Sequence, residues 1–288
     1  MQSSIIKRLP KYGRVFVRLA VFFERAFRRF DNRQVRTFVG ASAIPVLSMR
    51  VGGHRAYADW CFHAGVYAGL LASLNRQRLR VLDVGCGAGE IVPGILQVIS
   101  KDSTYLGVDI DARLVRQCQQ TFIDPRLRFS LVSGMSPFYE CDSTVQGRGL
   151  PEVCVDDQWD VIIAKAVFDH LSPKDVETYL HLFSRGLADG GLIIATVFLL
   201  NAEYWTKAKT LNGRFHFEDI YPGHPGFRYS AAFNPIPEAQ LAIESGRLAQ
   251  LLATAGLQIE RVIAGTWRDP QGQTGLDMPD TLLLARRK

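Results

Sequence analysis

The sequence predicts an α/β protein whose sheet is mostly parallel and carries helices on both faces. Three observations lead to this fold class. From Leu79 onward, short apolar runs alternate with amphipathic segments of helix length. The runs are apolar almost throughout, which is typical of parallel strands buried on both faces. The regular exchange of strand and helix favours parallel crossovers over hairpins.

The composition is that of a globular protein. The chain has 288 residues, of which 47% are hydrophobic and 22% charged, so it excludes a mostly disordered, collagen-like or disulfide-stapled protein. None of the five cysteines is part of a CxxC pair, which argues against a zinc knuckle and favours a reducing, cytoplasmic location. The run Leu192–Leu200 is too short to span a bilayer. Arginines interrupt the N-terminal residues, so no signal peptide is expected.

The positive charge is concentrated at the N-terminus. Residues 1–36 contain ten Lys or Arg and two acidic residues, which leaves the other 252 residues with a net charge of −2. Residues 14–36 have helical period, with five arginines on one face and a phenylalanine-rich face opposite. This helix either lies on an anionic membrane surface, at the inner membrane face, or packs its phenylalanines against the domain. We therefore divide the chain into a basic N-terminal extension and linker, 1–53, and a main domain, 54–288.

The main domain begins with an expected helix, His54–Asn75, in which Gly65 and Gly69 would permit close backbone approach. Seven strands are expected after it, and they are Arg80–Val84, Thr104–Val108, Arg128–Val132, Trp159–Ala164, Gly191–Phe198, Leu257–Ile263 and Thr281–Ala285. Four further helices are expected near Glu90–Ser100, Ala112–Thr121, Pro173–Leu187 and Pro237–Ala255.

A glycine-rich turn, Gly85-Cys86-Gly87-Ala88-Gly89, directly follows the first strand. Glycines let the backbone turn tightly and let a ligand approach it without interference from Cβ atoms. The spacing is GxGxG, which differs from the GxGxxG of nicotinamide and flavin binders and argues against a dehydrogenase. Asp83 precedes the turn, and Asp109 stands 24 residues after Gly85 at the end of the second strand. A carboxylate there can accept both hydroxyls of a ribose, and a helix N-cap is its other use.

Three segments in this order, VLDVGCGAGE, GVDID and WDVIIAKAVFDHL, resemble the class I S-adenosylmethionine (SAM)-dependent methyltransferases. The resemblance covers residues 54–288 and implies a Rossmann-like, seven-stranded, mostly parallel sheet. Two later segments, GGLIIATVFLLN and GTW…DTLLLAR, are similar to a bacterial subgroup that modifies glycans, lipids or secondary metabolites. The resemblance implies SAM as the cofactor, methyl transfer as the activity and S-adenosylhomocysteine as the product.

The resemblance also implies a cofactor site. Asp83 would lie near the amino group of SAM, Asp109 would take the ribose, and Ile110 would pack on the adenine. The backbone cleft would be lined by Gly85, Cys86, Gly87 and Gly89.

Two further parts of that site follow from the same resemblance. Gly134 and Met135 stand at the adenine edge, where many relatives have an acidic residue and this chain has none. Lys165 and Ala166 match the position whose backbone approaches the methionine part of the cofactor.

His170 is the first candidate for a catalytic base. Methyl transfer from a sulfonium requires alignment of the acceptor, and an alcohol or phenol acceptor must also lose a proton. His170 follows the fourth expected strand in VFDHL, and its other interpretation is a structural histidine that bonds a backbone group. No HExxH or other His and acid cluster requires a metal.

Residues 201–236 are expected to form an acceptor-binding insertion. Their cluster Arg214–Tyr229 gathers acid-base groups and aromatic rings, which suits a sugar ring or an aromatic alcohol. A surface excursion with its own small core is the other interpretation. If the segment is a strand, His216 and Glu218 share one face and become further candidate bases. The candidate acceptor contacts are Tyr139, in the long connection 137–157, together with Phe168, Phe217 and Tyr221.

The sequence thus predicts a SAM-dependent methyltransferase that O-methylates a small molecule or a glycan- or lipid-linked acceptor, with a histidine or acid as base. N- or C-methylation of a metabolite, and a non-catalytic SAM-binding subunit that recruits a partner or membrane, remain alternatives. Nucleic acid is not an expected partner, because Ala164–Val167 replaces the Asn/Asp-Pro-Pro-aromatic motif of base methylases and the domain is not basic.

Overall fold

The structure is a computed structural model that describes residues 44–45, 49–50, 57–133, 148–156, 158–211, 213–269 and 275–287. The expected basic helix of residues 14–36, the predicted boundary at residue 53 and three predicted site residues, Gly134, Met135 and Tyr139, lie outside the described residues. The chain divides into two compact units, Met1–Ser48 and Met49–Lys288, and the second is described here. No helix among the described residues is long and apolar enough to cross a membrane.

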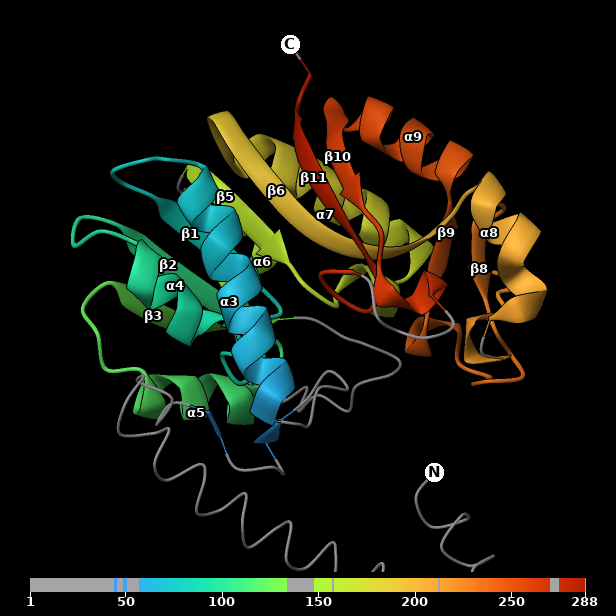
Figure 1. Ribbon diagram of the computed structural model, residues 1–288. Helices are drawn as coiled ribbons and strands as arrows, with labels where there is room; N and C mark the ends of the chain where they lie inside the picture. The colour runs from blue at the N-terminus through green and yellow to red at the C-terminus, as the bar shows by residue number, and fades with distance from the viewer. Residues whose placement is uncertain are drawn as a thin grey trace, which may run out of the picture. The chain divides into compact units, whose positions relative to one another are not determined.

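The central sheet is mostly parallel, as predicted (Figure 1). Its main strands are β1 (Arg80–Val84), β2 (Thr104–Asp109), β3 (Leu127–Ser133), β5 (Trp159–Ala164), β6 (Leu187–Leu200), β10 (Leu257–Ile263) and β11 (Asp280–Arg286). β1 pairs with β2 on one side and with β5 on the other. β11 is antiparallel to both β6 and β10. All seven predicted strands are confirmed, and β6 is longer than expected at both ends.

The order of the strands creates a switch point beside β1. The chain runs outward from β1 to β2 and β3, and then returns to β5 on the opposite side of β1. The loops that follow β1 and β5 therefore leave the sheet in opposite directions, and in open α/β sheets ligands bind at the carboxyl ends of strands at such a point. The candidate site is built there.

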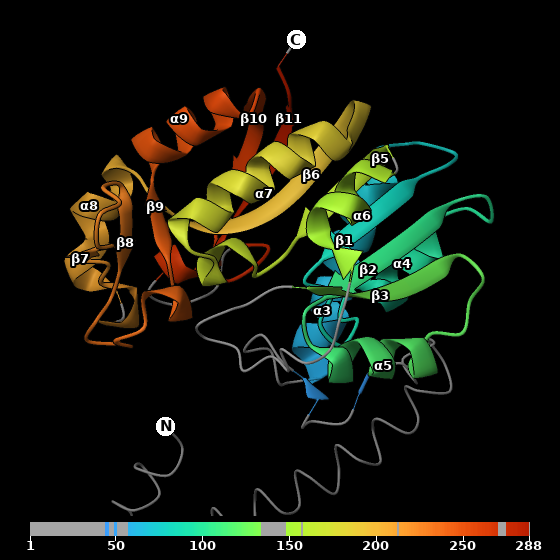
Figure 2. The same cartoon turned by 180° about the vertical axis from the view of Figure 1, so that it is seen from behind.

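Helices cover the sheet on both faces. Figure 1 shows α3 (Tyr57–Ser73) and α4 (Val92–Val98) in front of it, and Figure 2, from behind, shows α6 (Leu150–Asp156) and α7 (Pro173–Gly186) in front. α5 (Ala112–Thr121) contacts β2 and β3. α5 begins at Asp111, whose side chain accepts a hydrogen bond from the Arg113 N–H. Ser172 caps α7 in the same way, with a proline at the first helical position.

The close approach between α3 and α4 depends on Gly94 of α4. A Cβ atom at this position would lie 1.9 Å from the carbonyl oxygen of Ala64 on α3. The sequence analysis assigned the close approach to Gly65 and Gly69, and this is wrong, because an added Cβ at either would meet nothing within 4 Å. The contact is made by the backbone of Ala64 on α3, and the glycine that permits it is Gly94 on α4.

The region between β6 and β10 differs from the prediction. A single helix over Pro237–Ala255 is wrong in its first half, where a 3-10 turn at Pro237–Ala239 leads into the strand β9 (Ala242–Glu244), and only then does α9 (Ser245–Thr254) begin. β9 pairs with the last three residues of β6. The turn is dictated by tertiary pairing, since the local sequence alone favours a helix. The remaining short elements are β4 (Arg148–Gly149), α8 (Ala202–Lys207), β7 (Asp219–Ile220) and β8 (Phe227–Tyr229), with 3-10 turns at Phe168–His170, Ala208–Thr210, Gly213–Phe215 and Thr266–Arg268.

Two of the apolar clusters among the described residues bear on the site. The larger one fills the space between the sheet and the α6, α7 and α9 helices. The smaller one lies between the end of β6 and the 201–241 segment, and its members are Phe198, Leu200, Tyr204, Leu211, Phe215, Phe217, Ala242 and Trp267. The segment therefore has a core of its own, as one of the two interpretations of its sequence expected.

Candidate active site

The glycine turn is held against the end of β2. The N–H groups of Gly85 and Cys86 both donate to the carbonyl oxygen of Val108, at 2.8 and 3.0 Å. Gly85, Gly87 and Gly89 all have positive φ angles, of 72°, 54° and 80°, which other residues adopt only with strain. A Cβ on Gly85 would lie 2.6 Å from a methyl carbon of Val167, just after β5. The three glycines thus form a tight, bare backbone cradle.

Asp109 binds this cradle from the end of β2. Its Oδ2 accepts the Gly87 N–H and its Oδ1 accepts the Asp111 N–H, both at 2.8 Å. Burial raises the pKa of Asp109 above its usual value, although the bonds from Asp111 and Gly87 oppose the rise. The N-cap of α5 is Asp111, so Asp109 is not needed for that role. Ile110, next to it, is half-buried and packs against the larger core.

Asp83 lies under the turn and is almost fully buried. The Tyr105 hydroxyl donates to its Oδ2 at 2.5 Å. Burial raises the pKa of Asp83 to about 7; the bond from Tyr105 works against this, and the charge of Asp109 adds to it. The carboxyl group is therefore poised between its two protonation states near neutral pH.

A buried ionic cluster adjoins the turn. Lys165 Nζ lies 2.9 Å from Glu90 Oε2 and 3.6 Å from Asp277 Oδ2. His63 Nδ1 lies 2.7 Å from Glu90 Oε1. Burial by itself would lower the pKa of Lys165, but the charges of Asp277 and Glu90 raise it above the usual value. Lys165 is therefore a cation here, and its side chain as well as its backbone belongs to the site.

Tyr67 of α3 faces the same group of charges. Its hydroxyl is fully buried and has no hydrogen-bond partner among the described residues. Burial, and then the charges of Asp277, Asp83 and Glu90, raise its pKa well above the usual value. A buried hydroxyl without a partner costs about 1–3 kcal/mol. The Tyr67 hydroxyl is therefore suited to donate a hydrogen bond to a bound ligand.

The backbone after β5 is strained where the cofactor site was predicted. Ala166 has a φ of 52°, a conformation that costs a non-glycine residue of order 1–3 kcal/mol. Its N–H donates to the Thr196 hydroxyl at 2.7 Å. Strain of this kind persists where surrounding structure holds it, and here it turns the chain from β5 into the Phe168–His170 turn.

His170 contacts polar groups of this turn and of the Pro237–Ala239 turn. Its Nδ1 lies 2.9 Å from the Glu238 carbonyl oxygen and its Nε2 lies 3.5 Å from Asp169 Oδ2. A carbonyl oxygen only accepts, so Nδ1 carries a hydrogen, and in the ring with a single hydrogen Nε2 is the basic nitrogen. The Tyr221 hydroxyl donates to Glu238 Oε1 at 2.5 Å. Burial and this bond raise the pKa of Tyr221 to about 12.

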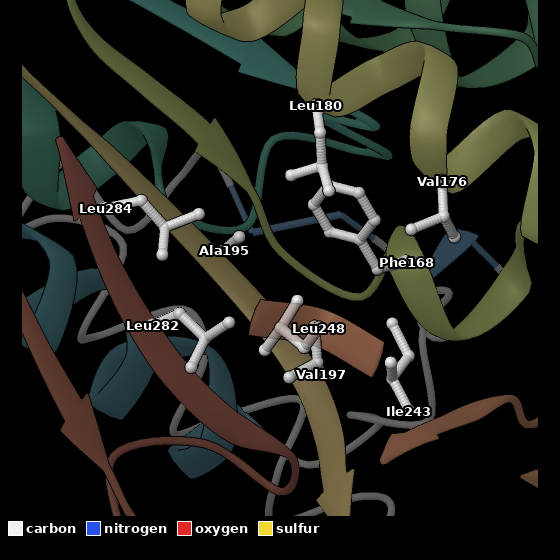
Figure 3. A pocket seen from close by; sticks show the side chains of 9 residues that line it. All are labelled: Phe168, Val176, Leu180, Ala195, Val197, Ile243, Leu248, Leu282 and Leu284. Carbon is white, nitrogen blue, oxygen red and sulfur yellow. The ribbon is translucent and has the colours of Figure 1, made fainter. Parts of the chain in front are cut away.

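Two of the predicted aromatic contacts are core residues. Phe217 is fully buried against Phe198 and Trp267. Phe168 is 3% exposed, its ring packs on Phe183, and Figure 3 shows it lining a small apolar cavity behind the turn. The prediction that these two rings contact the acceptor does not agree with their positions, because hydrophobic burial outweighed the proximity to His170 in sequence.

The two further candidate bases are placed differently from the expectation. Residues 214–218 do not form a strand, since a 3-10 turn at Gly213–Phe215 precedes β7, and the argument that His216 and Glu218 share a face is therefore wrong. His216 Nε2 lies 3.1 Å from the Leu211 carbonyl oxygen. Glu218 is exposed. No described contact joins either residue to His170.

Sequence reasoning missed several members of the site. The sequence analysis gave no role to Tyr67, Tyr105, Glu90 and Asp277, because they come from segments that only the fold brings together. For Glu90 there was one signal, its position directly after the glycine turn. Among the described residues, no group of three or more His, Cys, Asp or Glu is arranged to hold a metal ion.

Residues 82–193 match the family model described as a methyltransferase domain. Residues 82–193 therefore form a SAM-dependent methyltransferase domain. The match begins in β1 and ends in β6, so it contains the glycine turn, Asp109 and His170. The cofactor of the methyltransferase domain is SAM.

Solved structures of methyltransferases are similar to this chain at low identity. A TehB-like SAM-dependent methyltransferase from Corynebacterium glutamicum is 16% identical over 77% of this chain and 88% of its own, with a TM-score of 0.45. A SAM-dependent methyltransferase from Clostridium acetobutylicum is 12% identical over 92% and 99%, with a TM-score of 0.48. Magnesium protoporphyrin IX methyltransferase from Synechocystis is 15% identical over 89% and 95%, with a TM-score of 0.47. The assignment of the methyltransferase domain depends on the family match and not on these structures.

The residues of the methyltransferase domain fit a SAM molecule. The glycine turn offers bare backbone that a Cβ would obstruct, and Tyr67 offers a buried donor without a partner. Asp83 and Asp109 supply carboxylates at the ends of two neighbouring strands. Such a set suits a ligand with a sugar and a cationic end.

Proposed function

We propose that the methyltransferase domain transfers the methyl group of SAM to a hydroxyl group of a small molecule or of a glycan- or lipid-linked acceptor. The observation that carries this proposal is the geometry of His170. Its Nδ1–H donates to a backbone carbonyl oxygen, which leaves Nε2, near Asp169, as the nitrogen that can take up a proton. A hydroxyl acceptor needs such a base, whereas an uncharged amine already has a lone pair for the attack.

SAM supplies an electrophilic methyl group. Transfer to the acceptor oxygen would break the carbon–sulfur bond of bound SAM and leave the electron pair on sulfur. The proton of the acceptor hydroxyl passes to Nε2 of His170. Asp169 Oδ2, 3.5 Å from that nitrogen, stabilises the imidazolium that forms.

The test of the base is a pair of variants, His170→Ala and His170→Gln. We expect methyl transfer from labelled SAM to hydroxylated acceptors to fall by about 100-fold or more in both, while calorimetric binding of SAM stays within about twofold. Full activity in His170→Gln would contradict the proposal. Transfer to amines or to carbon in the wild type would favour N- or C-methylation. Binding of SAM without any transfer would favour a non-catalytic subunit.

We propose the cofactor site from the same geometry. It consists of Asp83, Gly85, Cys86, Gly87, Gly89, Asp109, Ile110, Lys165 and Ala166. Asp109→Ala removes the acceptor of the Gly87 N–H, and we expect it to weaken SAM binding at least about tenfold. Asp111→Ala is the matched control. It removes the cap of α5, costs about 1 kcal/mol of stability, and should leave SAM affinity unchanged.

We further propose that residues 14–36 bind an anionic membrane surface, and that the protein acts in the cytoplasm at that surface. The support is the arginine face opposite the phenylalanine face in the sequence. Co-sedimentation with vesicles that contain anionic lipid should occur at low salt and weaken at high salt. Equal sedimentation of a chain that lacks residues 1–36 would contradict this.

A further inference from the structure

Two buried polar side chains beside His170 have polar atoms without partners. Gln240 is 5% exposed, and neither its Nε2 nor its Oε1 has a hydrogen-bond partner in the part of the chain that the structure describes. Asp169 is 4% exposed, and its Oδ1 lacks a partner in the same sense. Buried polar groups are nearly always hydrogen-bonded in folded proteins, so groups of this kind indicate a ligand or an ordered water.

The backbone holds these two residues together at the candidate active site. The Leu241 N–H donates to the Asp169 carbonyl oxygen at 2.8 Å, and His170 Nδ1 donates to the Glu238 carbonyl oxygen at 2.9 Å. Gln240 therefore stands between two contacts that tie its segment to the Phe168–His170 turn. The His170 side chain is 15% exposed, so the cluster borders solvent at the imidazole.

The hydrogen-bonding atoms without partners define which chemical group could bind them. Asp169 Oδ1 and Gln240 Oε1 only accept, whereas Gln240 Nε2 only donates. A hydroxyl group both donates and accepts, and it can satisfy an amide and a carboxylate at once. Asp169 Oδ2 already lies beside His170 Nε2. Because Oδ1 belongs to the same carboxylate, a group that it binds lies close to the group that faces Nε2.

We propose that Asp169 and Gln240 bind a second hydroxyl group, vicinal to the hydroxyl that faces His170, so that the acceptor is a vicinal diol such as a sugar ring or a catechol. This inference rests on the proposed O-methylation. Asp169 Oδ1 accepts from the second hydroxyl, and the Gln240 amide donates to it. Asp169 and Gln240 are then residues that determine specificity, and a mono-alcohol leaves their buried groups without partners. A site built to bind a hydroxyl discriminates strongly against the analogue that lacks it.

The experiment compares diol and mono-alcohol probes with labelled SAM. Catechol is paired with phenol, and methyl α-D-mannopyranoside is paired with cyclohexanol. We expect the wild type to label at least one diol about tenfold or more faster than its mono-alcohol partner. Gln240→Leu should bring that ratio close to one, with SAM affinity unchanged. Gln119→Leu is the matched control, because it removes an amide of α5 that donates to the Phe129 carbonyl oxygen on β3, and it should keep the wild-type ratio.

Each other outcome overturns the inference in a recognisable way. Equal labelling of diols and mono-alcohols, or a ratio that survives Gln240→Leu, leaves O-methylation standing and removes the diol site. Labelling of amines alone, or of no probe, removes both proposals.

A thermal melt checks that Gln240→Leu folds. Replacing a buried amide without partners by an apolar side chain of similar size should keep or raise the melting temperature. A large drop would show that the amide already has its bonds, through ordered water, and would also overturn the inference.

Discussion

At the scale of single residues, Asp83 makes the stability of the folded protein depend on pH. Its carboxyl group is buried and bonded to Tyr105, and its pKa is raised to about 7, against about 3.9 in an unfolded chain. The folded state thus binds this proton more tightly than the unfolded state. The stability that the proton contributes is present in full below about pH 4 and is lost as the pH rises toward 7.

The Asp83→Asn variant tests this linkage. Between pH 4.5 and 6.5 the slope from this group approaches about −1.4 kcal/mol per pH unit in the free energy of unfolding. Asn keeps an acceptor for the Tyr105 hydroxyl and cannot titrate, so the variant should lack this slope and exceed the wild type in stability at pH 8. The measurement is urea denaturation of both proteins from pH 4.5 to 8. Parallel pH profiles for the two would contradict the prediction.

Phe168 shows how a core position and a site position compete for one residue. Its ring lies in the cavity wall with Val176, Leu180 and Ile243 (Figure 3). The cavity has a volume of about 10 Å³, which is at the lower limit for one water molecule, and its apolar walls should keep it dry.

The consequence is a prediction about Phe168→Ala. The variant should lose about 3–5 kcal/mol of stability, as large-to-small core changes do, and the KM for the acceptor should change little at a temperature where it remains folded. Denaturation together with steady-state kinetics gives both numbers. A raised KM with unchanged stability would restore the predicted role in acceptor binding.

At the scale of elements, the contact between α3 and α4 places Tyr67 and His63 beside the glycine turn. The helices approach at Gly94, where backbone meets backbone. Because the obstructing atom is the Ala64 carbonyl oxygen and not the end of a flexible side chain, a side chain at position 94 must separate the two helices. The position of Tyr67 against Asp83 depends on this contact.

We therefore predict that Gly94→Ala destabilises the protein by about 2–4 kcal/mol and weakens SAM binding as α3 moves. The matched control is Gly69→Ala on α3, where the new Cβ meets nothing within 4 Å. That change should stabilise the protein by about 0.5–1 kcal/mol through helix propensity. Urea denaturation and calorimetry compare the two, and a neutral Gly94→Ala would contradict the described packing.

At the scale of the whole domain, Asp280 joins β11 to the end of β6 and to the turn at Gly265–Arg268. It is fully buried at the start of β11, and it accepts from Leu199 N–H at 3.0 Å, Gly265 N–H at 3.0 Å and Trp267 Nε1–H at 3.1 Å. Arg268 Nε lies 2.7 Å away and completes an ion pair. Trp267 in turn packs in the smaller core with Tyr204 and Phe217, so one carboxylate anchors that core to β6 and β11.

Asp280→Asn should cost about 3–5 kcal/mol, because it removes one partner of a buried ion pair and turns an amide N–H toward groups that donate. Thermal denaturation measures the loss. Asp160→Asn is the control. Asp160 also pairs with arginine, but it lies at the start of β5 and its side chain is 17% exposed. The loss of stability should therefore stay near about 1 kcal/mol. Similar losses for both variants would show that Asp280 is not a special junction.

The sheet and the glycine turn could be predicted from local sequence, and the family resemblance implied the cofactor. Periodic apolar runs identify buried strands because burial acts on each strand through its own side chains, and seven strands were located in this way. The glycine turn could also be predicted from the sequence. The positive φ angles at Gly85, Gly87 and Gly89 favour glycine at these positions, so the residue types themselves indicate the turn.

Which side chains meet in the site depends on long-range packing. Tyr67, Glu90, Lys165 and Asp277 come from distant segments, and nothing in their local sequence records that they share a buried space. Phe168 and Phe217 are aromatic residues near polar groups, as is typical of binding sites. Hydrophobic burial nevertheless placed them in the larger and the smaller core. The turn at Pro237–Ala239 replaced an expected helix because pairing of β9 with β6 outweighed local propensity. Local rules therefore fixed the elements, and non-local packing fixed the site.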